Sequence, residues 1–134
     1  MNHPTIPLDH HCSVIHYEST GIWALDKATG VLSHPNKERK KGKPARTLLN
    51  AEYNHDEECY TWDNKDGEQQ KLYLVHRLDS PTSGVIIATS KLSTAHIIKD
   101  LFRNKEVHKT YFALIRPKGA IKEGIWKAHL KEKR

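Results

Sequence analysis

Cysteines and long apolar runs are scarce in this chain of 134 residues. Its two cysteines, Cys12 and Cys59, form no C-x-x-C pair, which argues against a zinc ribbon and against a disulfide scaffold and predicts free thiols. No apolar run approaches the roughly 20 residues that a membrane-spanning helix needs. The N-terminus has neither the basic nor the apolar segment of a signal peptide. We therefore expect a cytoplasmic protein with no membrane association.

Metal-binding spacings are also lacking. His10-His11-Cys12, and His55 with Cys59, are the candidate ligand groups, and both lie in polar segments. The ten histidines are scattered along the chain, as is usual for surface groups and for satisfied core groups. The sequence therefore predicts no metal site.

Charge, in contrast, is plentiful and uneven. The formal net charge is +6, and residues 37–46 carry six basic groups against one acidic group. Residues 118–134 carry six basic groups against two acidic ones, whereas residues 52–68 carry seven acidic groups and one lysine. Basic blocks of this kind indicate a polyanionic partner, although they also occur as solvated loops. The acidic stretch 55–70 has no apolar period and is expected to be an exposed loop.

The length suits one domain with a modest core. Residues 1–13 show no periodicity and are predicted to form a loose tail, which leaves residues 14–134 for the domain.

The stretch 72–90 organises the rest of the chain. Apolar runs at Leu72–Val75 and Val85–Ala88 flank His76-Arg77-Leu78-Asp79 and the polar turn 80–84, which predicts strand, loop, strand. If the first strand continues through Asp79, Arg77 and Asp79 share one face and Leu78 lies on the other. On the residues alone, a structural salt bridge at a strand end is the favoured interpretation of this charged pair.

The remaining elements follow from periodicity and turn residues. The apolar positions Ala95, Ile98, Leu101 and Phe102 predict an amphipathic helix at 92–104, with Ser90 or Ser93 as N-cap. The other predicted elements are strands at 14–18 and 22–27, a short helix at 45–53, and a strand at 107–115.

The string His76-Arg77-Leu78-Asp79, followed by Thr82-Ser83-Gly84, resembles the catalytic motif of the RluA family of RNA pseudouridine synthases. Two further segments are similar to that family. Residues 27–35 match the phrase that opens its catalytic domain at Lys27, Gly30, Val31, His34 and Pro35, with Ala28 where proline is usual. Lys109-Thr110-Tyr111 matches a lysine-x-tyrosine strand, and Tyr111 lies 32 residues after Asp79 as in the family.

The resemblance covers about residues 14–130 and implies an α+β fold, a mixed, mainly antiparallel sheet with packed helices. The family's G-R-T-H-Q-I-R-like segment has no counterpart here, so the resemblance implies a catalytic domain truncated at its C-terminus. It also implies isomerisation of uridine to pseudouridine in rRNA or tRNA without metal or organic cofactor. Asp79, Tyr111 and Arg77 are the implied catalytic residues.

RNA is the expected partner of the basic surface. The predicted RNA-binding residues are Lys37, Arg39, Lys40, Lys41, Lys43, Arg46, His76 and Lys109. Three readings stay open: an active synthase completed by a second polypeptide or by self-association, a catalytically incomplete RNA-binding remnant, and a protein-interaction fragment in which Asp79 is only structural.

Overall fold

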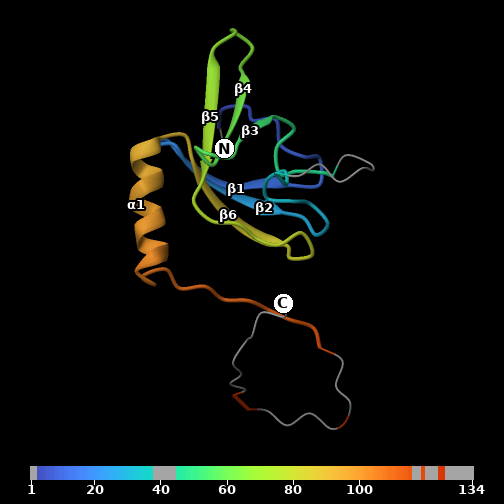
Figure 1. Ribbon diagram of the computed structural model, residues 1–134. Coiled ribbons are helices and arrows are strands. Elements are labelled where there is room, and N and C mark those ends of the chain that lie inside the picture. The colour runs from blue at the N-terminus through green and yellow to red at the C-terminus, as the bar shows by residue number, and fades with distance from the viewer. Residues whose placement is uncertain (1–2, 38–44, 116–118, 120–123, 126–134) are drawn as a thin grey trace.

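The structure is a computed structural model that describes residues 3–37, 45–115, 119 and 124–125. Within these residues one antiparallel sheet, in the order β1-β2-β6-β5-β4-β3, carries one helix (Figure 1). This confirms the predicted mainly antiparallel sheet. That helix, α1, is too short and too polar to cross a membrane. The elements are β1 Ser13–Glu18, β2 Ile22–Lys27, β3 Glu52–Asn54, β4 Cys59–Asp63, β5 Gln69–Leu74, β6 Gly84–Thr89 and α1 Leu92–Arg103.

The first two strands form the predicted hairpin. Its turn requires glycine, because Gly21 has a φ of 98° and a Cβ there would lie 2.4 Å from the Ser90 hydroxyl oxygen. The Gly21 amide donates to the Glu18 carbonyl, and the Ser90 amide donates to the Gly21 carbonyl. The turn thus joins the hairpin to the end of β6.

Alternating side chains give the sheet two apolar faces. On β5, Leu72 and Leu74 belong to the main core with Trp23, Leu25, Tyr60 and Ile86, whereas Tyr73 points to the opposite face. That opposite face packs against α1 through Ala95, Ile98 and Phe102. The helix bounds and three of its four predicted apolar contacts are as expected, but Leu101 stays 38% exposed. Its N-cap is Lys91, without the serine side-chain bond that was predicted.

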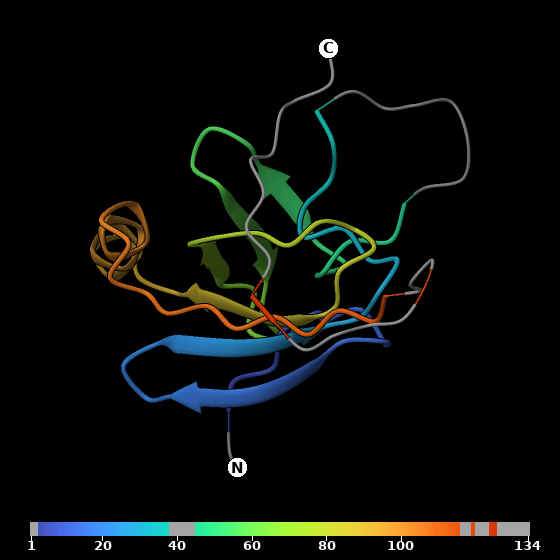
Figure 2. The same cartoon turned by 90° about the horizontal axis from the view of Figure 1, so that it is seen from below.

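The sheet bends between β5 and β6. These strands pair through only Tyr73↔Thr89 and Leu74↔Ala88, while β2 and β6 pair along six residues. In Figure 1 the β4–β5 hairpin stands away from the layer of β1, β2 and β6, and Figure 2 shows that layer from below with α1 end-on beside it. The chain that links β5 to β6 therefore starts in one half of the sheet and ends in the other.

The short helix predicted at 45–53 is wrong. This segment instead makes isolated bridges from Leu49 to Leu8 and from Thr47 to Leu32, and it ends in β3. Leu48 and Leu49 are consecutive and both fully buried. The backbone of this segment bonds to residues 7–9 and to Leu32, in place of the bonds within the segment that a helix needs.

The exposed loop predicted at 55–70 is also wrong, since the segment contains β4 and the start of β5. Cys59 and Tyr60 are fully buried despite the surrounding acidic residues. The charges occupy the hairpin turns, where the Asn64 side chain accepts from the Asp66 and Glu68 amides. The net charge concealed a short strand because the acidic side chains lie in the turns and at the strand end, whereas Cys59 and Tyr60 inside the strand are buried.

Residues 3–12, expected as a loose tail, lie against the sheet. Ile6 and Leu8 pack on the main core, and the Asp9 amide donates to the Leu48 carbonyl at 2.9 Å. Asp9 itself is 3% exposed. The two apolar residues are too few for a periodic signal but sufficient to dock the segment.

The strand predicted at 107–115 is wrong as well. After α1 the chain runs below the sheet without joining it (Figure 1). Within the described residues this segment pairs with no strand, and Phe112 and Leu114 remain fully exposed. Strand-forming side chains do not make a strand unless a neighbouring backbone accepts and donates the ladder bonds.

Candidate active-site loop

The segment that carries Asp79 is a loop, since β5 ends at Leu74. The expectation that the strand continues through Asp79 is wrong, and His76 supplies the reason. Its Nε2 accepts the Ile87 amide at 2.9 Å, so a side chain takes a donor that would otherwise extend the β5–β6 ladder. The expected alternation survives in the extended loop, because Arg77 and Asp79 are exposed and Leu78 is 9% exposed.

Leu78 is held by the buried side chain of Ser33. The Ser33 hydroxyl donates to the Leu78 carbonyl at 2.7 Å and accepts from the Leu78 amide at 3.0 Å. The Ser33 carbonyl in turn accepts from the Tyr60 hydroxyl at 2.8 Å. Asp79 therefore follows a residue whose backbone is fixed to the core.

The other side of Asp79 is held by residues 27–30. The Gly30 amide donates to the Ser80 carbonyl at 2.7 Å, and the Thr29 hydroxyl donates to the Pro81 carbonyl at 2.9 Å. Thr82 donates its amide to the Asp79 carbonyl at 2.9 Å, which closes a turn. The Asp79 side chain is thus presented to solvent from a backbone fixed on both sides.

Lys27 is the buried cation beneath this loop. Its side chain is 0% exposed, and its Nζ donates to the carbonyls of Val31 at 2.7 Å, Ala28 at 3.0 Å and Ser80 at 3.4 Å. Burial lowers the pKa of Lys27, while the nearby Cys12 and Asp79 oppose the shift. Lys27 thus ties residues 28–31 to Ser80, the residue that follows Asp79.

Arg77 does not pair with Asp79 in this arrangement. Within the described ranges, no ion pair of 4.0 Å or less joins them. The charge of Arg77 instead acts on Tyr53: burial, with Glu58 and Cys59, raises the pKa of Tyr53 to about 12, and Arg77 opposes this shift. The guanidinium group therefore remains exposed beside the loop.

His76 is held in the structure by packing and hydrogen bonding. Its ring stacks on Phe102 of α1 at a centroid distance of 4.7 Å, and Lys109 lies over the same phenylalanine at 5.9 Å. Burial, and secondarily Lys109, lowers the pKa of His76. Because Nε2 accepts a hydrogen bond, the neutral ring carries its proton on Nδ1.

Tyr111 lies apart from these contacts, in the segment after α1. Its side chain is 62% exposed, and no hydrogen bond or aromatic contact within the described part of the chain joins it to the Asp79 loop. The structure therefore brings residues 27–33 and 76–82 together. Among the described residues, no hydrogen bond or aromatic contact brings Tyr111 to them.

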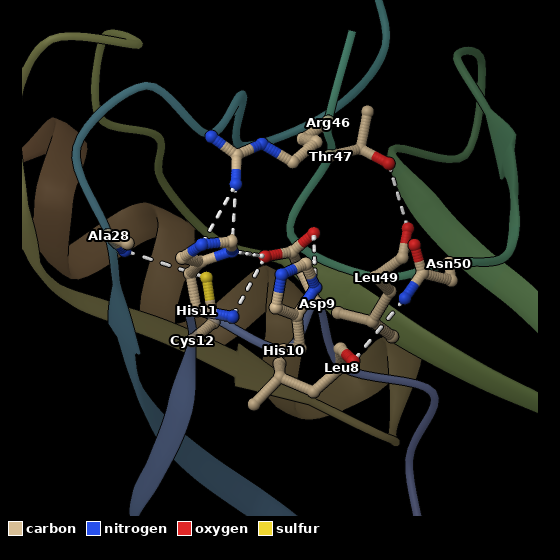
Figure 3. A network of polar contacts seen from close by, with 10 residues as sticks. All are labelled: Leu8, Asp9, His10, His11, Cys12, Ala28, Arg46, Thr47, Leu49 and Asn50. Carbon is tan, nitrogen blue, oxygen red and sulfur yellow. Dashed lines mark hydrogen bonds and ion pairs between the residues drawn. The ribbon is translucent and has the colours of Figure 1, made fainter. Parts of the chain in front are cut away.

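The predicted basic surface is described only in part. Arg39, Lys40, Lys41 and Lys43 lie outside the described residues. Lys37 is exposed, as is Arg46, whose guanidinium group is 2.8 Å from Nδ1 and 3.1 Å from Nε2 of His11 (Figure 3). Arg46 is thus tied to the N-terminal segment rather than extended into solvent.

Asp9, His10 and His11 place three possible metal-ligand atoms within 4.8 Å of one another. The Asp9 carboxylate already accepts from the His11 amide at 3.0 Å and contacts the His11 ring at 3.2 Å, and Arg46 lies beside that ring (Figure 3). Although burial opposes it, these histidines hold the pKa of Asp9 below its usual value. A guanidinium cation at the third ligand is unfavourable for a metal ion.

Sequence reasoning missed Ser33 as a loop anchor, although it lies inside the matched phrase 27–35. A separate cavity of about 610 Å³, lined by Tyr17, Trp23 and Trp62, also had no sequence signal. Ser90 lines it, so it lies at the opposite end of β6 from the Asp79 loop.

Comparison with known proteins identifies the family. The family model for RNA pseudouridylate synthase matches residues 21–134, so this chain belongs to that family. The match includes both segments that meet at Asp79.

Curated relatives carry related names. The chain is 31% identical to ribosomal large subunit pseudouridine synthase D of Borreliella burgdorferi over 100 residues, which are 75% of this chain and 29% of that protein. It is 34% identical to tRNA pseudouridine synthase C of Pasteurella multocida over 100 residues, covering 75% of this chain and 35% of that protein. It is 39% identical to ribosomal large subunit pseudouridine synthase C of Escherichia coli K12 over 64 residues, which are 48% of this chain and 18% of that protein.

The chain therefore spans about a third or less of the length of these curated relatives. No solved structure gives a significant match.

Proposed function

We propose that this chain acts in the isomerisation of uridine to pseudouridine in RNA, with Asp79 as the reacting carboxylate. The observation that carries the proposal is the presentation of Asp79: its side chain is exposed, while Leu78 and Ser80 on either side of it are bonded to the 27–33 segment. Family membership and the relatives' names support the same reaction. The substrate is rRNA or tRNA.

The reaction breaks the bond between N1 of uracil and C1′ of ribose and forms a bond from C5 to C1′. Asp79 attacks C1′, or stabilises its oxocarbenium character, as N1 departs with the bonding electrons. The uracil turns, C5 bonds to C1′ as the carboxylate is released, and the C5 proton is lost while N1 gains one. No atoms are gained or lost overall, so no co-reactant is required.

Lys27 is proposed to hold the backbone that carries Asp79, because its Nζ donates to the Ser80 carbonyl at 3.4 Å. Arg77 is exposed beside the loop and is proposed to fill the space that the flipped uridine leaves. Tyr111 is proposed to stack on the flipped uracil, with its hydroxyl near the C5 proton. This role requires the 107–115 segment to come to the loop when RNA binds.

RNA binding without turnover is the second candidate, and the placement of Tyr111 favours it. An exposed tyrosine with no recorded contact to the loop leaves the pocket for the flipped base unfinished. The basic residues, including Lys37, would still bind phosphates.

Asp79→Asn tests the catalytic proposal. The protein is incubated with unmodified rRNA and tRNA transcripts, and pseudouridine is scored by primer extension blocked at carbodiimide-modified positions. We expect the wild type to form pseudouridine and Asp79→Asn to form none, because the amide keeps the shape but is a poor nucleophile. Asp66→Asn, at an exposed hairpin turn, is the matched control and should keep full activity.

Activity that persists in Asp79→Asn would exclude the carboxylate mechanism. An inactive wild type that still binds RNA would favour binding without turnover. Neutralising the basic block should make the dependence of log affinity on log salt less steep, by about 0.7 for each lost contact to single-stranded RNA. The residues to neutralise are Lys37, Arg39, Lys40, Lys41 and Lys43. An unchanged slope would show that this block is only a solvated surface.

A further inference from the structure

Three partly exposed rings form a cluster that the reaction does not use. The rings of His34 and Tyr53 stack at a centroid distance of 4.9 Å with an interplanar angle of 10°. His55 meets Tyr53 edge-on at 5.0 Å and His34 at 5.8 Å. Tyr53 rests in turn on the fully buried Tyr60 at 4.9 Å. The cluster, named here the aromatic platform, is supported by the core on one side and partly open on the other.

The aromatic platform is fixed to the Asp79 loop by covalent and hydrogen-bonded neighbours. His34 follows Ser33, whose hydroxyl bonds both backbone groups of Leu78. Tyr60, which supports Tyr53, donates its hydroxyl to the Ser33 carbonyl. The charge of Arg77 is also felt at Tyr53. These links, together with the effect of Arg77 on Tyr53, place the platform close to the segment that carries Asp79.

The surroundings of the platform suit a polyanion with flat bases. Lys37 follows His34 by three residues and is exposed, at the start of the basic block 37–46. Unpaired bases of RNA stack on tyrosine and histidine rings, while lysines contact the adjacent phosphates. Extruding a uridine for chemistry unstacks its neighbours, and an aromatic surface beside the reacting carboxylate offsets that cost.

We propose that His34, Tyr53 and His55 bind an unpaired RNA base that neighbours the target uridine, by stacking on the platform. This inference rests on the proposed function, because it takes RNA as the ligand and the Asp79 loop as the place of reaction. Stacking tolerates every base, since each has a flat face, and the larger purines should bind best.

Substitutions that remove or keep a flat ring test the platform. The probe is a fluorescein-labelled RNA hairpin with an unpaired loop that contains uridine, and affinity is measured by fluorescence anisotropy. Tyr53→Leu and His34→Ala should each weaken binding about tenfold, within the range found when a stacking ring is removed. Tyr53→Phe and His34→Phe keep a ring and should bind nearly as the wild type does.

Two controls separate stacking from charge and from general damage. The salt dependence of Tyr53→Leu and His34→Ala should equal that of the wild type, because no phosphate contact is lost. His96→Ala, an exposed histidine of α1, should leave affinity unchanged. His34 lies outside the strands, so its variant tests the proposal even if Tyr53→Leu fails to fold.

Abasic RNAs locate the stacked base. Removing the base at one loop position next to the target uridine should weaken the wild type about tenfold and should abolish the difference between wild type and His34→Ala. The proposal is overturned if folded ring-removing variants bind like the wild type, if no abasic position removes the difference, or if the wild type does not bind the hairpin.

The same RNAs are scored for pseudouridine, which separates the two proposals. Ring-dependent affinity without pseudouridine leaves the platform standing and removes the proposed reaction. If pseudouridine forms but affinity does not depend on the rings, the proposed reaction stands and the platform proposal is overturned.

Discussion

Replacing Ser33 by alanine should destabilise the protein far more than the loss of one hydroxyl suggests. Ser33 is 4% exposed and bonds both the amide and the carbonyl of Leu78, which is itself buried. In the alanine variant both backbone groups lose this partner away from bulk water. Each such group costs about 1–3 kcal/mol, so the free energy of unfolding should fall by roughly 2–6 kcal/mol.

Urea unfolding followed by tryptophan fluorescence measures this loss. With a slope of about 2 kcal/mol per molar urea, the midpoint should fall by about 1–3 M. Ser19→Ala is the matched control, because Ser19 is exposed in the β1–β2 turn and should leave the midpoint unchanged. Faster hydrogen exchange at the Leu78 amide should accompany the loss in Ser33→Ala.

A Ser33→Ala loss of no more than about 0.5 kcal/mol, the range of ordinary surface substitutions, would refute the reasoning. It would mean that the hydroxyl does not hold the loop in solution. Pseudouridine yield should fall with the same substitution, since Asp79 follows Leu78 directly.

The remaining predictions concern titration and burial. A spectrophotometric titration should find a tyrosine with a pKa of about 12, and Tyr53→Phe should remove it. Because this pKa lies above the unfolded value of about 10, the free energy of unfolding should fall as pH rises from about 10 to 12. Nitrogen NMR should show His76 with its proton on Nδ1. Because the pKa of His76 is lowered in the folded protein, the free energy of unfolding should fall progressively as pH falls below about 6.5. His76→Phe should abolish this pH dependence. Lys27→Met should lower the thermal midpoint, because three carbonyls lose their donor. Burial lowers the pKa of Lys27 in the folded protein, so the wild type should gain stability relative to this variant as pH rises toward about 10.4, the pKa of an unfolded lysine. An ordinary pKa for Tyr53 would contradict its burial in the folded protein. Stability of the His76→Phe or Lys27→Met variant equal to that of the wild type at every pH would contradict the contacts described for that residue.

Elements whose pattern reflects local contacts were predictable from the sequence. The β1–β2 hairpin has alternating side chains and a glycine turn, and α1 has a clear helical period. Residues 107–115 have an equally good strand pattern but lack a pairing partner in the described residues. A local pattern reports what a segment can form, and the neighbouring backbone decides whether it does so.

The site shows the same division. Asp79 and Arg77 were selected from a contiguous string, and both are exposed in one loop. The partner that fixes this loop, Ser33, is 45 residues away from Leu78, and a serine in a turn carries no signal of such a contact. Tyr53 was assigned to the end of the predicted helix 45–53, and His55 to the predicted exposed loop 55–70, so the contact between their rings was not expected. Long-range hydrogen bonds and ring contacts were therefore the part that the sequence alone could not supply.

The bend between β5 and β6 has a consequence for cooperativity. Only two residue pairs join the three-stranded units β1-β2-β6 and β5-β4-β3, so backbone pairing across the join is weak. Side chains bridge it instead: Ile86 and Leu74 meet in the main core, and Ala95 of α1 packs over Tyr73 and beside Ile87 on the opposite face. The helix acts as a splint across this join, and we expect the chain to unfold in one transition because of this packing rather than because of strand pairing. A bulky residue at the fully buried Ala95 would separate the splint from the join and turn a single melting transition into two, with the Asp79 loop stretched between halves that no longer unfold together.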